Sequence, residues 1–191
     1  MQHQDVTILN SLITTTIDSV NGFRRSAENA ESENFKKLFT HFAQTRAQLV
    51  GRLQQRVREL GGTPEDDGSI KAALHRGWED LRTALSRHDD EAVIAEVERG
   101  EDYIKEKYEM ALSDSDLSAE SLALVRSCYQ NVREGHDRAS QLKHGLKSGD
   151  SFDDAFSRMD WSDRLTGSDS DSSYTPPPTT GTSSRPIPPA V

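Results

Sequence analysis

Three polar side chains are the first candidates for chemistry in this chain of 191 residues: Arg46, Glu101 and His136. Each interrupts a stripe of apolar residues that recurs at helical spacing, so each is expected to face the interior of a helical protein. Carboxylates and imidazoles that converge inside a bundle of four helices can hold two iron or manganese ions. A carboxylate beside a guanidinium forms an ion pair instead. These residues therefore build either a metal centre or a buried ion pair.

A di-metal centre of this kind needs one inward Glu from each of two helices and a Glu-x-x-His motif from each of the other two. Glu101 and His136 match this pattern. Arg133, however, stands three residues before His136, where the motif requires Glu, and Arg46 faces the place of a cation. Because an unpaired buried charge costs several kcal/mol, we expect Arg46 and Glu101 to pair, with His136 hydrogen-bonded nearby. This trio either only fixes the register of the helices or has a functional role, and the sequence leaves both open.

Metal binding is the alternative interpretation. In that case the protein binds a divalent cation, or handles iron or manganese, through Glu98, Glu101 and His136. The sequence contains no glycine-rich phosphate loop and no nucleophile elbow, so we expect no enzyme activity and no bound cofactor. The single cysteine, Cys128, lies on an apolar stripe and is expected to be an unreactive core residue.

The spacing of the apolar side chains predicts the helices that position these residues. It indicates helices over residues 5–30, 32–60, 70–85, 90–112 and 118–147. Helix starts are expected at Asp5, Ser32, Ser69, Asp89 or Asp90, and Ser118, which are residue types that cap helices.

Four of the predicted helices are long, and the third is short. Two long hairpins joined by a crossover that carries a short helix have ferritin-like connectivity. The predicted fold is therefore an all-α, ferritin-like four-helix bundle. Within the short helix, His75, Gly77 and Trp78 are expected to pack the crossover against the bundle.

A change in composition near residue 147 divides the chain. Six of the seven prolines lie after residue 175, and residues 148–191 contain no Lys and no Glu but many Ser and Asp. We therefore predict a bundle domain over residues 1–147 and a disordered acidic tail over residues 148–191. Within the tail, Phe152, Phe156, Met159 and Trp161 predict a short helix at 152–165. This helix either folds back on the bundle or docks into a groove of a partner protein.

Composition also excludes several classes of function. The 23 basic and 32 acidic residues give a net charge of −9, which argues against binding to nucleic acid. No stretch approaches the roughly 20 apolar residues of a membrane span, and no signal peptide is evident, so we expect a cytoplasmic protein. Phe23, Phe39 and Tyr103 lie at the edges of the apolar stripes, where they could support a homodimer.

Several longer segments resemble a known family. They are LGGTPEDDGSIKAALHRGWEDL, DDEAVIAEVERGEDYIKEKYEMAL and VREGHDRASQL, and together they contain Gly61-Gly62, His75-Arg76-Gly77-Trp78, Gly100-Glu101-Asp102, Tyr108 and His136-Asp137. Over roughly residues 5–146, the chain is similar to a family of bacterial ferritin-like four-helix-bundle proteins of unknown function. The resemblance implies a fold distantly related to ferritins and rubrerythrins, with no established activity. Glu101 and His136 match motifs of this family.

Two functions remain open at this stage. The first is a non-enzymatic, stress-associated bundle that acts through contacts with an unknown protein partner, with Arg46, Glu101 and His136 as a structural polar core. The second is a metal-binding or iron-handling protein that uses Glu98, Glu101 and His136.

Overall fold

The computed structural model describes residues 2–66, 75–159 and 161, and it is helical wherever this part of the chain is regular. Its helices are α1 (Gln2–Asn29), α2 (Glu33–Glu59), α3 (His75–Ser86), α4 (Asp90–Leu112), α5 (Ala119–Lys147) and α6 (Phe152–Ser157). The prediction of an all-α protein is confirmed for these residues.

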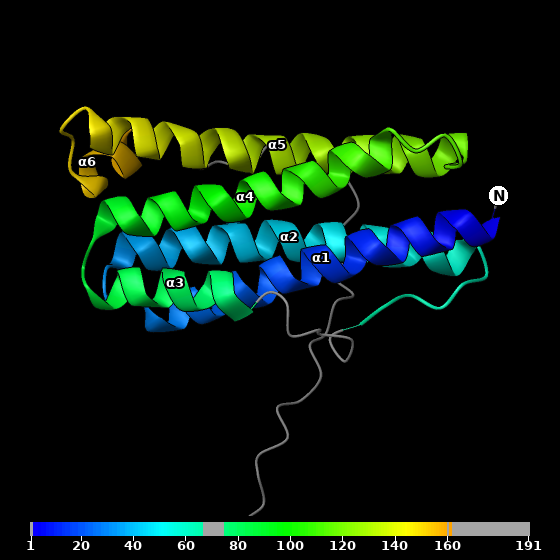
Figure 1. Cartoon of the computed structure of the whole chain (residues 1–191), viewed down its shortest axis with the longest axis horizontal. Helices are drawn as coiled ribbons and strands as arrows, with labels where there is room; N and C mark the ends of the chain where they lie inside the picture. The colour runs from blue at the N-terminus through cyan, green and yellow to red at the C-terminus, as the bar shows by residue number, and fades with distance from the viewer. Residues whose placement is uncertain (1, 67–74, 160, 162–191) are drawn as a thin grey trace, which may run out of the picture.

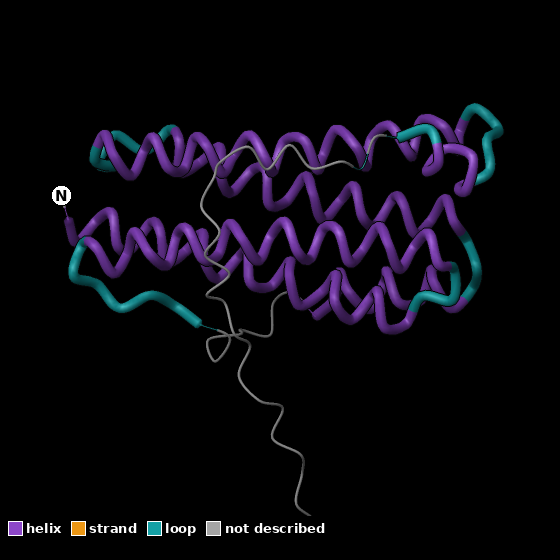
Figure 2. Tube along the Cα trace, turned by 180° about the vertical axis from the view of Figure 1, so that it is seen from behind, coloured by secondary structure: helices purple, strands orange, loops and turns teal. Residues whose placement is uncertain are grey.

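The four long helices lie side by side as two antiparallel pairs (Figure 1), in which α1 packs on α2 and α4 packs on α5. The short helix α3 lies against α4 and α1. As Figure 2 shows from behind, the α2–α3 connection leaves at the end of the molecule where the N-terminus lies. Helix α3 ends at the opposite end, where α4 begins, so α2 ends and α4 begins at opposite ends of the molecule.

Side-chain caps set the starts of three helices where the sequence predicts them. Ser32 caps α2 by accepting a hydrogen bond from the backbone N–H of Phe35, and Ser118 caps α5 in the same way. Asp89, rather than Asp90, caps α4, and its carboxylate accepts from the Ala92 N–H at 3.0 Å. The predicted break between the third and fourth helices is therefore confirmed. Ser69 and the expected start of the third helix lie outside the described residues, as do the side chains of His75 and Trp78.

Asp5 does not cap α1, because that helix already includes Gln2. Instead its fully buried carboxylate crosses to the start of α5. It accepts hydrogen bonds from the Ser118 N–H at 2.9 Å, from the Ser118 hydroxyl and from the Ser121 hydroxyl at 2.7 Å. Burial alone would raise the pKa of Asp5, but these hydrogen bonds, with nearby Arg56, lower it below its ordinary value.

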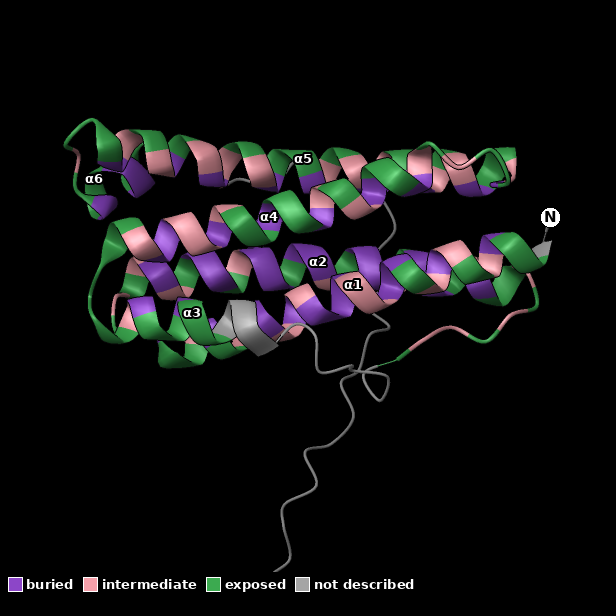
Figure 3. Cartoon of the chain, in the orientation of Figure 1, coloured by how far each residue is buried: buried purple, intermediate pink, exposed green. Residues whose placement is uncertain are grey.

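The apolar core consists of two clusters, one toward each end of the helices. Figure 3 shows that buried residues run along the length of the long helices. The aromatic cluster contains Phe23, Phe35, Phe39 and Phe42 at the α1–α2 turn. The aliphatic cluster lies toward the N-terminus and contains one buried tyrosine, Tyr108. Phe23 and Phe39 are therefore buried core residues, and the expectation that these two residues at the stripe edges could support a homodimer is wrong. The homodimer itself stays a prediction.

Helix α6 folds back and extends the aromatic cluster. The rings of Phe152 and Phe35 are stacked with centroids 3.7 Å apart, and Phe156 stacks on Trp161 at 4.6 Å. The Trp161 indole N–H donates to the Phe156 carbonyl at 3.0 Å. Phe152 and Phe156 are buried, and Met159 and Trp161 pack against the same cluster.

This packing moves the domain boundary and decides between the two alternatives for the short helix. The packed unit continues through Trp161 instead of ending at residue 147, because apolar side chains of the predicted tail complete the core. Phe152, Phe156, Met159 and Trp161 fold back on the bundle, which is the first of the two alternatives, and these side chains are engaged within the chain. The described helix spans Phe152–Ser157; residues 162–165 of the predicted helix, and the predicted disorder over 162–191, lie outside the described residues.

Replacing Phe152 tests the contribution of α6 to the fold. We expect Phe152→Ala to lower the free energy of unfolding by about 3–5 kcal/mol, because truncation of a buried Phe leaves a cavity. Urea denaturation followed by circular dichroism measures this change. Ser157→Ala, at an exposed position of the same helix, is the matched control, and an equal effect of both variants would contradict the packing of α6.

Replacing Asp5 tests the contact between α1 and α5. We expect Asp5→Asn to cost about 1–3 kcal/mol at neutral pH, because an amide cannot accept all three buried hydrogen bonds. The folded pKa of Asp5 is lowered, so its stabilising contribution is complete above the unfolded pKa and is lost as the pH falls through the folded value. The difference in stability between the wild type and Asp5→Asn should therefore shrink below about pH 4. A difference that stays constant down to pH 2 would contradict this assignment.

Candidate functional site

The candidate site is a polar layer between the two apolar clusters, made of Arg46 on α2, Glu101 on α4 and Gly135 on α5. Arg46 Nη2 donates to Glu101 Oε2, and both side chains are fully buried. The predicted ion pair is thus confirmed. It sits midway along the helices, with aromatic cluster residues on one side and aliphatic cluster residues on the other.

Arg46 connects three helices. Besides its ion pair with α4, its Nη1 donates to the backbone carbonyl of Asn131 on α5 at 3.5 Å. A side chain of α2 thus holds both helices of the second pair, and the layer joins the two hairpins through polar contacts.

Gly135 is the residue that sequence reasoning missed. A Cβ atom at this position would lie 2.6 Å from Glu101 Oε2 and 2.7 Å from Arg46 Nη2. The absence of a side chain therefore makes room for the ion pair. Helical phase is the signal that could have found it, because Gly135 lies three residues after Val132 and four before Ala139, both of which are fully buried.

His136 does not join the ion pair, so this part of the prediction is wrong. Gly135 takes the inward position, and the next residue is rotated by about 100° around the helix. The His136 side chain is 21% exposed, and its Nε2 lies 3.0 Å from Asp102 Oδ1 while its Nδ1 lies 3.2 Å from Asp137 Oδ1. The imidazole therefore bridges α4 and α5 at the edge of the layer.

Two atoms of the ion pair lack a hydrogen-bond partner in the described part of the chain. They are Arg46 Nε and Glu101 Oε1, and both are buried. Burial raises the pKa of Glu101 above its ordinary value, although Arg46 acts in the opposite direction. The ion pair thus holds the layer together, although one polar atom of each partner has no hydrogen bond.

The ligand set of the metal alternative is not assembled. Glu98 pairs with Lys143 of α5 instead of joining Glu101 and His136. Burial would raise the pKa of Glu98, but the hydrogen bond and charge of Lys143 lower it. Among the described residues, no group of three or more His, Cys, Asp or Glu side chains is arranged to hold a metal ion.

Two more buried groups lie in the aliphatic cluster. The Tyr108 hydroxyl lies 3.1 Å from Thr16 Oγ1, and burial raises the pKa of this phenol. Burial also raises the pKa of the Cys128 thiol to about 11. A thiol with this pKa stays protonated at neutral pH, and the thiolate is the reactive form, which agrees with an unreactive core cysteine.

Comparison with known proteins places the chain in a family. Residues 4–114 match the model of a domain of unknown function (DUF2383), which is more than half of the chain. The chain belongs to this family. The DUF2383 match runs from α1 to just after α4, so it includes Arg46 and Glu101 but not Gly135. No curated protein shows significant similarity to the chain.

The DUF2383 family is defined without a function, so the function of this chain has to be argued from its own geometry. One further observation bears on it. Within the ranges that the structure describes, no helix is both long and apolar enough to cross a lipid bilayer.

A double-mutant cycle tests the energetics of the polar layer. We expect Arg46→Met and Glu101→Leu each to cost about 3–5 kcal/mol, because each leaves the opposite charge buried and unpaired. The double variant should unfold at or above the wild-type midpoint, because replacing a whole buried ion pair by apolar residues is neutral or stabilising by about 1–4 kcal/mol. Chemical denaturation measures all four proteins.

The exposed pair of Arg99 and Asp80 provides the control for this cycle. Asp80→Ala should change stability by no more than about 1 kcal/mol. A double variant whose loss equals the sum of the two single losses would show that Arg46 and Glu101 do not interact.

Proposed function

We propose that this member of the DUF2383 family is a non-enzymatic, ferritin-like bundle that acts through protein contacts and carries an ion pair in place of a di-metal centre. The observation that carries the proposal is the guanidinium of Arg46, which is fully buried against Glu101 in the middle of the four long helices. A metal ion at this position would be repelled by the positive charge of Arg46.

The order of the helices supports the ferritin-like part of the proposal. A first long hairpin, a crossover that carries a short helix and a second long hairpin follow one another along the chain. Bundles with one long crossover connection have this order. Fold alone does not determine function. The replacement of di-metal ligands by an ion pair therefore says more about the function of this chain than its ferritin-like helix order does.

The burial of the layer supports the absence of catalysis. Neither Arg46 nor Glu101 reaches solvent, and Gly135 closes the third side so tightly that an added methyl group would clash. A substrate cannot approach these charges without opening the bundle. The stress-associated role, the bacterial origin and the cytoplasmic location are further parts of this proposal, and they rest on the sequence and on its resemblance alone.

Metal content provides the test of this function. We expect untagged protein, purified without chelators and then incubated with Fe²⁺ or Mn²⁺, to contain far less than one metal ion per chain by plasma mass spectrometry. Its thermal midpoint should not change with either ion, because binding to the folded state would raise it. A stoichiometric metal that is lost in Glu101→Gln would overturn the proposal and make Glu101 a ligand.

Arg46→Glu is the informative companion variant. We expect it to unfold at a lower temperature than the wild type, because it places two carboxylates together in the interior. If the guanidinium is what excludes a cation, added Mn²⁺ should restore part of this loss in the variant and have no effect on the wild type. Circular dichroism establishes that each variant is helical before its metal content is compared.

A further inference from the structure

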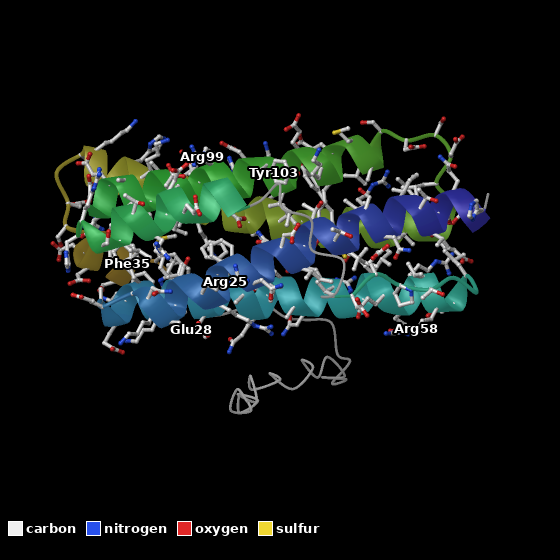
Figure 4. The ribbon with its side chains drawn as sticks, turned by 60° about the horizontal axis from the view of Figure 1, so that its bottom comes forward. Arg25, Glu28, Phe35, Arg58, Arg99 and Tyr103 are labelled. Atoms are coloured by element: carbon white, nitrogen blue, oxygen red, sulfur yellow. The ribbon has the colours of Figure 1, made fainter. Side chains whose placement is uncertain are left out.

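Helix α6 occupies a place at one end of the bundle, beside the start of α2 and the last turn of α5. Figure 4 shows Phe35 where the start of α2 meets α6, and the ring of Phe152 stacks on it. Ala155 lies so close to the last turn of α5 that a Cβ atom at Gly145 would be 3.1 Å from the Ala155 Cβ. We call this place, beside Phe35 and Gly145, the α6 slot. The structure shows directly which segment fits it.

The segment in the slot is held together by contacts of its own. Ser151 caps α6 by accepting a hydrogen bond from the Asp154 N–H at 3.2 Å. At the other end, the Trp161 indole N–H donates to the Phe156 carbonyl, and these two rings are stacked. Because these contacts lie within the segment, it keeps them when it moves as a unit. We call this unit, residues 151–159 with Trp161, the C-terminal plug.

The plug depends on a slot for its order. Helix α6 has six residues, and an isolated helix of that length is not stable in water. Phe152 and Phe156, which are buried in the slot, supply the apolar contacts that keep the plug folded. A plug that leaves one slot therefore gains by entering another.

A single turn joins the plug to the rest of the chain. Ser148, Gly149 and Asp150 stand between the end of α5 and the cap of α6. Gly149 has a φ of +94°, a conformation that residues with a side chain rarely adopt. A Cβ atom at Gly149 would meet nothing within 4 Å. The return of the chain onto its own α5 therefore depends on the backbone of Gly149 and not on packing around it.

A second copy of the chain offers an identical slot. With Gly149 at a negative φ, the chain would leave α5 in another direction, and Phe152 could stack on Phe35 of the second copy. This exchange keeps the contacts of the plug and changes only the turn, which makes exchange of identical elements a low-cost route to dimers. The closed form competes at an effective concentration in the millimolar range, because the connection is short.

We propose that Gly149 is the hinge of a C-terminal exchange, in which the plug of each chain fills the α6 slot of a second copy and forms a two-fold symmetric dimer. The partner is a second copy of this chain, because the plug is the segment that the structure shows to fit the slot. This inference goes beyond the proposed function and does not depend on the polar layer.

Gly149→Ala tests the hinge, because it places a side chain at a positive φ without a steric clash. The substitution penalises the closed form and spares the exchanged form, whose turn is free of that constraint. Sedimentation velocity of the full-length protein, equilibrated over about 1–1,000 μM, should show the dimer of Gly149→Ala at concentrations at least about tenfold lower than that of the wild type.

Gly100→Ala is the matched control for the hinge variant. Gly100 is exposed within α4, a Cβ atom there would also meet nothing within 4 Å, and its φ is not positive. We expect Gly100→Ala to dimerise at the same concentration as the wild type.

Two further measurements distinguish exchange from any other dimer. Phe152→Ala in the Gly149→Ala background should abolish the gain in dimerisation, because the plug then loses the ring that fills the slot. Circular dichroism establishes that this double variant is helical. In a dimer of Gly149→Ala made from two samples with different isotope labels, nuclear Overhauser contacts between the rings of Phe35 and Phe152 should connect different chains.

Three results would overturn the proposed exchange. Gly149→Ala could dimerise no more readily than Gly100→Ala, its dimer could persist in the presence of Phe152→Ala, or the contact between Phe35 and Phe152 in that dimer could stay within one chain.

Discussion

The structure is organised around one buried contact, the ion pair of Arg46 and Glu101. Taking two charges out of water is expensive, and the attraction between them repays that cost only when their geometry is good. This requirement restricts how α2, α4 and α5 can slide or rotate, because a shift of one helical turn would separate the charges and leave both unpaired. Apolar contacts alone tolerate such shifts far better. We therefore propose that the layer specifies the register of the helices more than it adds to their stability.

The two apolar clusters stabilise different ends of the molecule. The aromatic cluster closes the end where α1 turns into α2, and it is completed by α6 from beyond the fifth helix. The aliphatic cluster fills the other half, where Asp5 ties the start of α1 to the start of α5. Each half thus combines non-directional burial with a directional contact, either stacked rings or a buried carboxylate. The polar layer sets the boundary between the halves.

Much of this architecture could be predicted from the sequence, for physical reasons that also explain the errors. The apolar residues of a long amphipathic helix mark the side that faces the core. Arg46 and Glu101 fall on that side of their helices, so the sequence predicts two inward-facing charges of opposite sign. Gly135 was missed because a residue without a side chain leaves no mark on a pattern of apolar and polar residues. The same pattern predicts His136, one position later, as the inward group, although its side chain lies about 100° away around the helix.

Two further differences between prediction and structure share a cause, which is distance along the chain. Asp5 has the residue type and place of an N-cap, and nothing local shows that its partners are Ser118 and Ser121. Residues 148–161 lie in a segment whose average composition is that of a tail. The spacing of its aromatic residues predicts a short helix with two alternative destinations, and the stacking of Phe152 on Phe35 decides for the core. Local propensity and average composition cannot report contacts made with the far end of a chain.

The same long-range contacts bear on how the protein is made. During synthesis, α1 and α2 leave the ribosome first and can pair through local contacts. The Asp5 carboxylate, however, waits for hydroxyls more than a hundred residues later, and Phe35 waits for Phe152. Both ends of the molecule are thus sealed by segments from the C-terminal half. A stalled nascent chain would keep an unfinished core open at both ends, and such surfaces favour aggregation. Synthesis of α5 and α6, more than the early pairing of α1 and α2, therefore determines when both ends of the core can close.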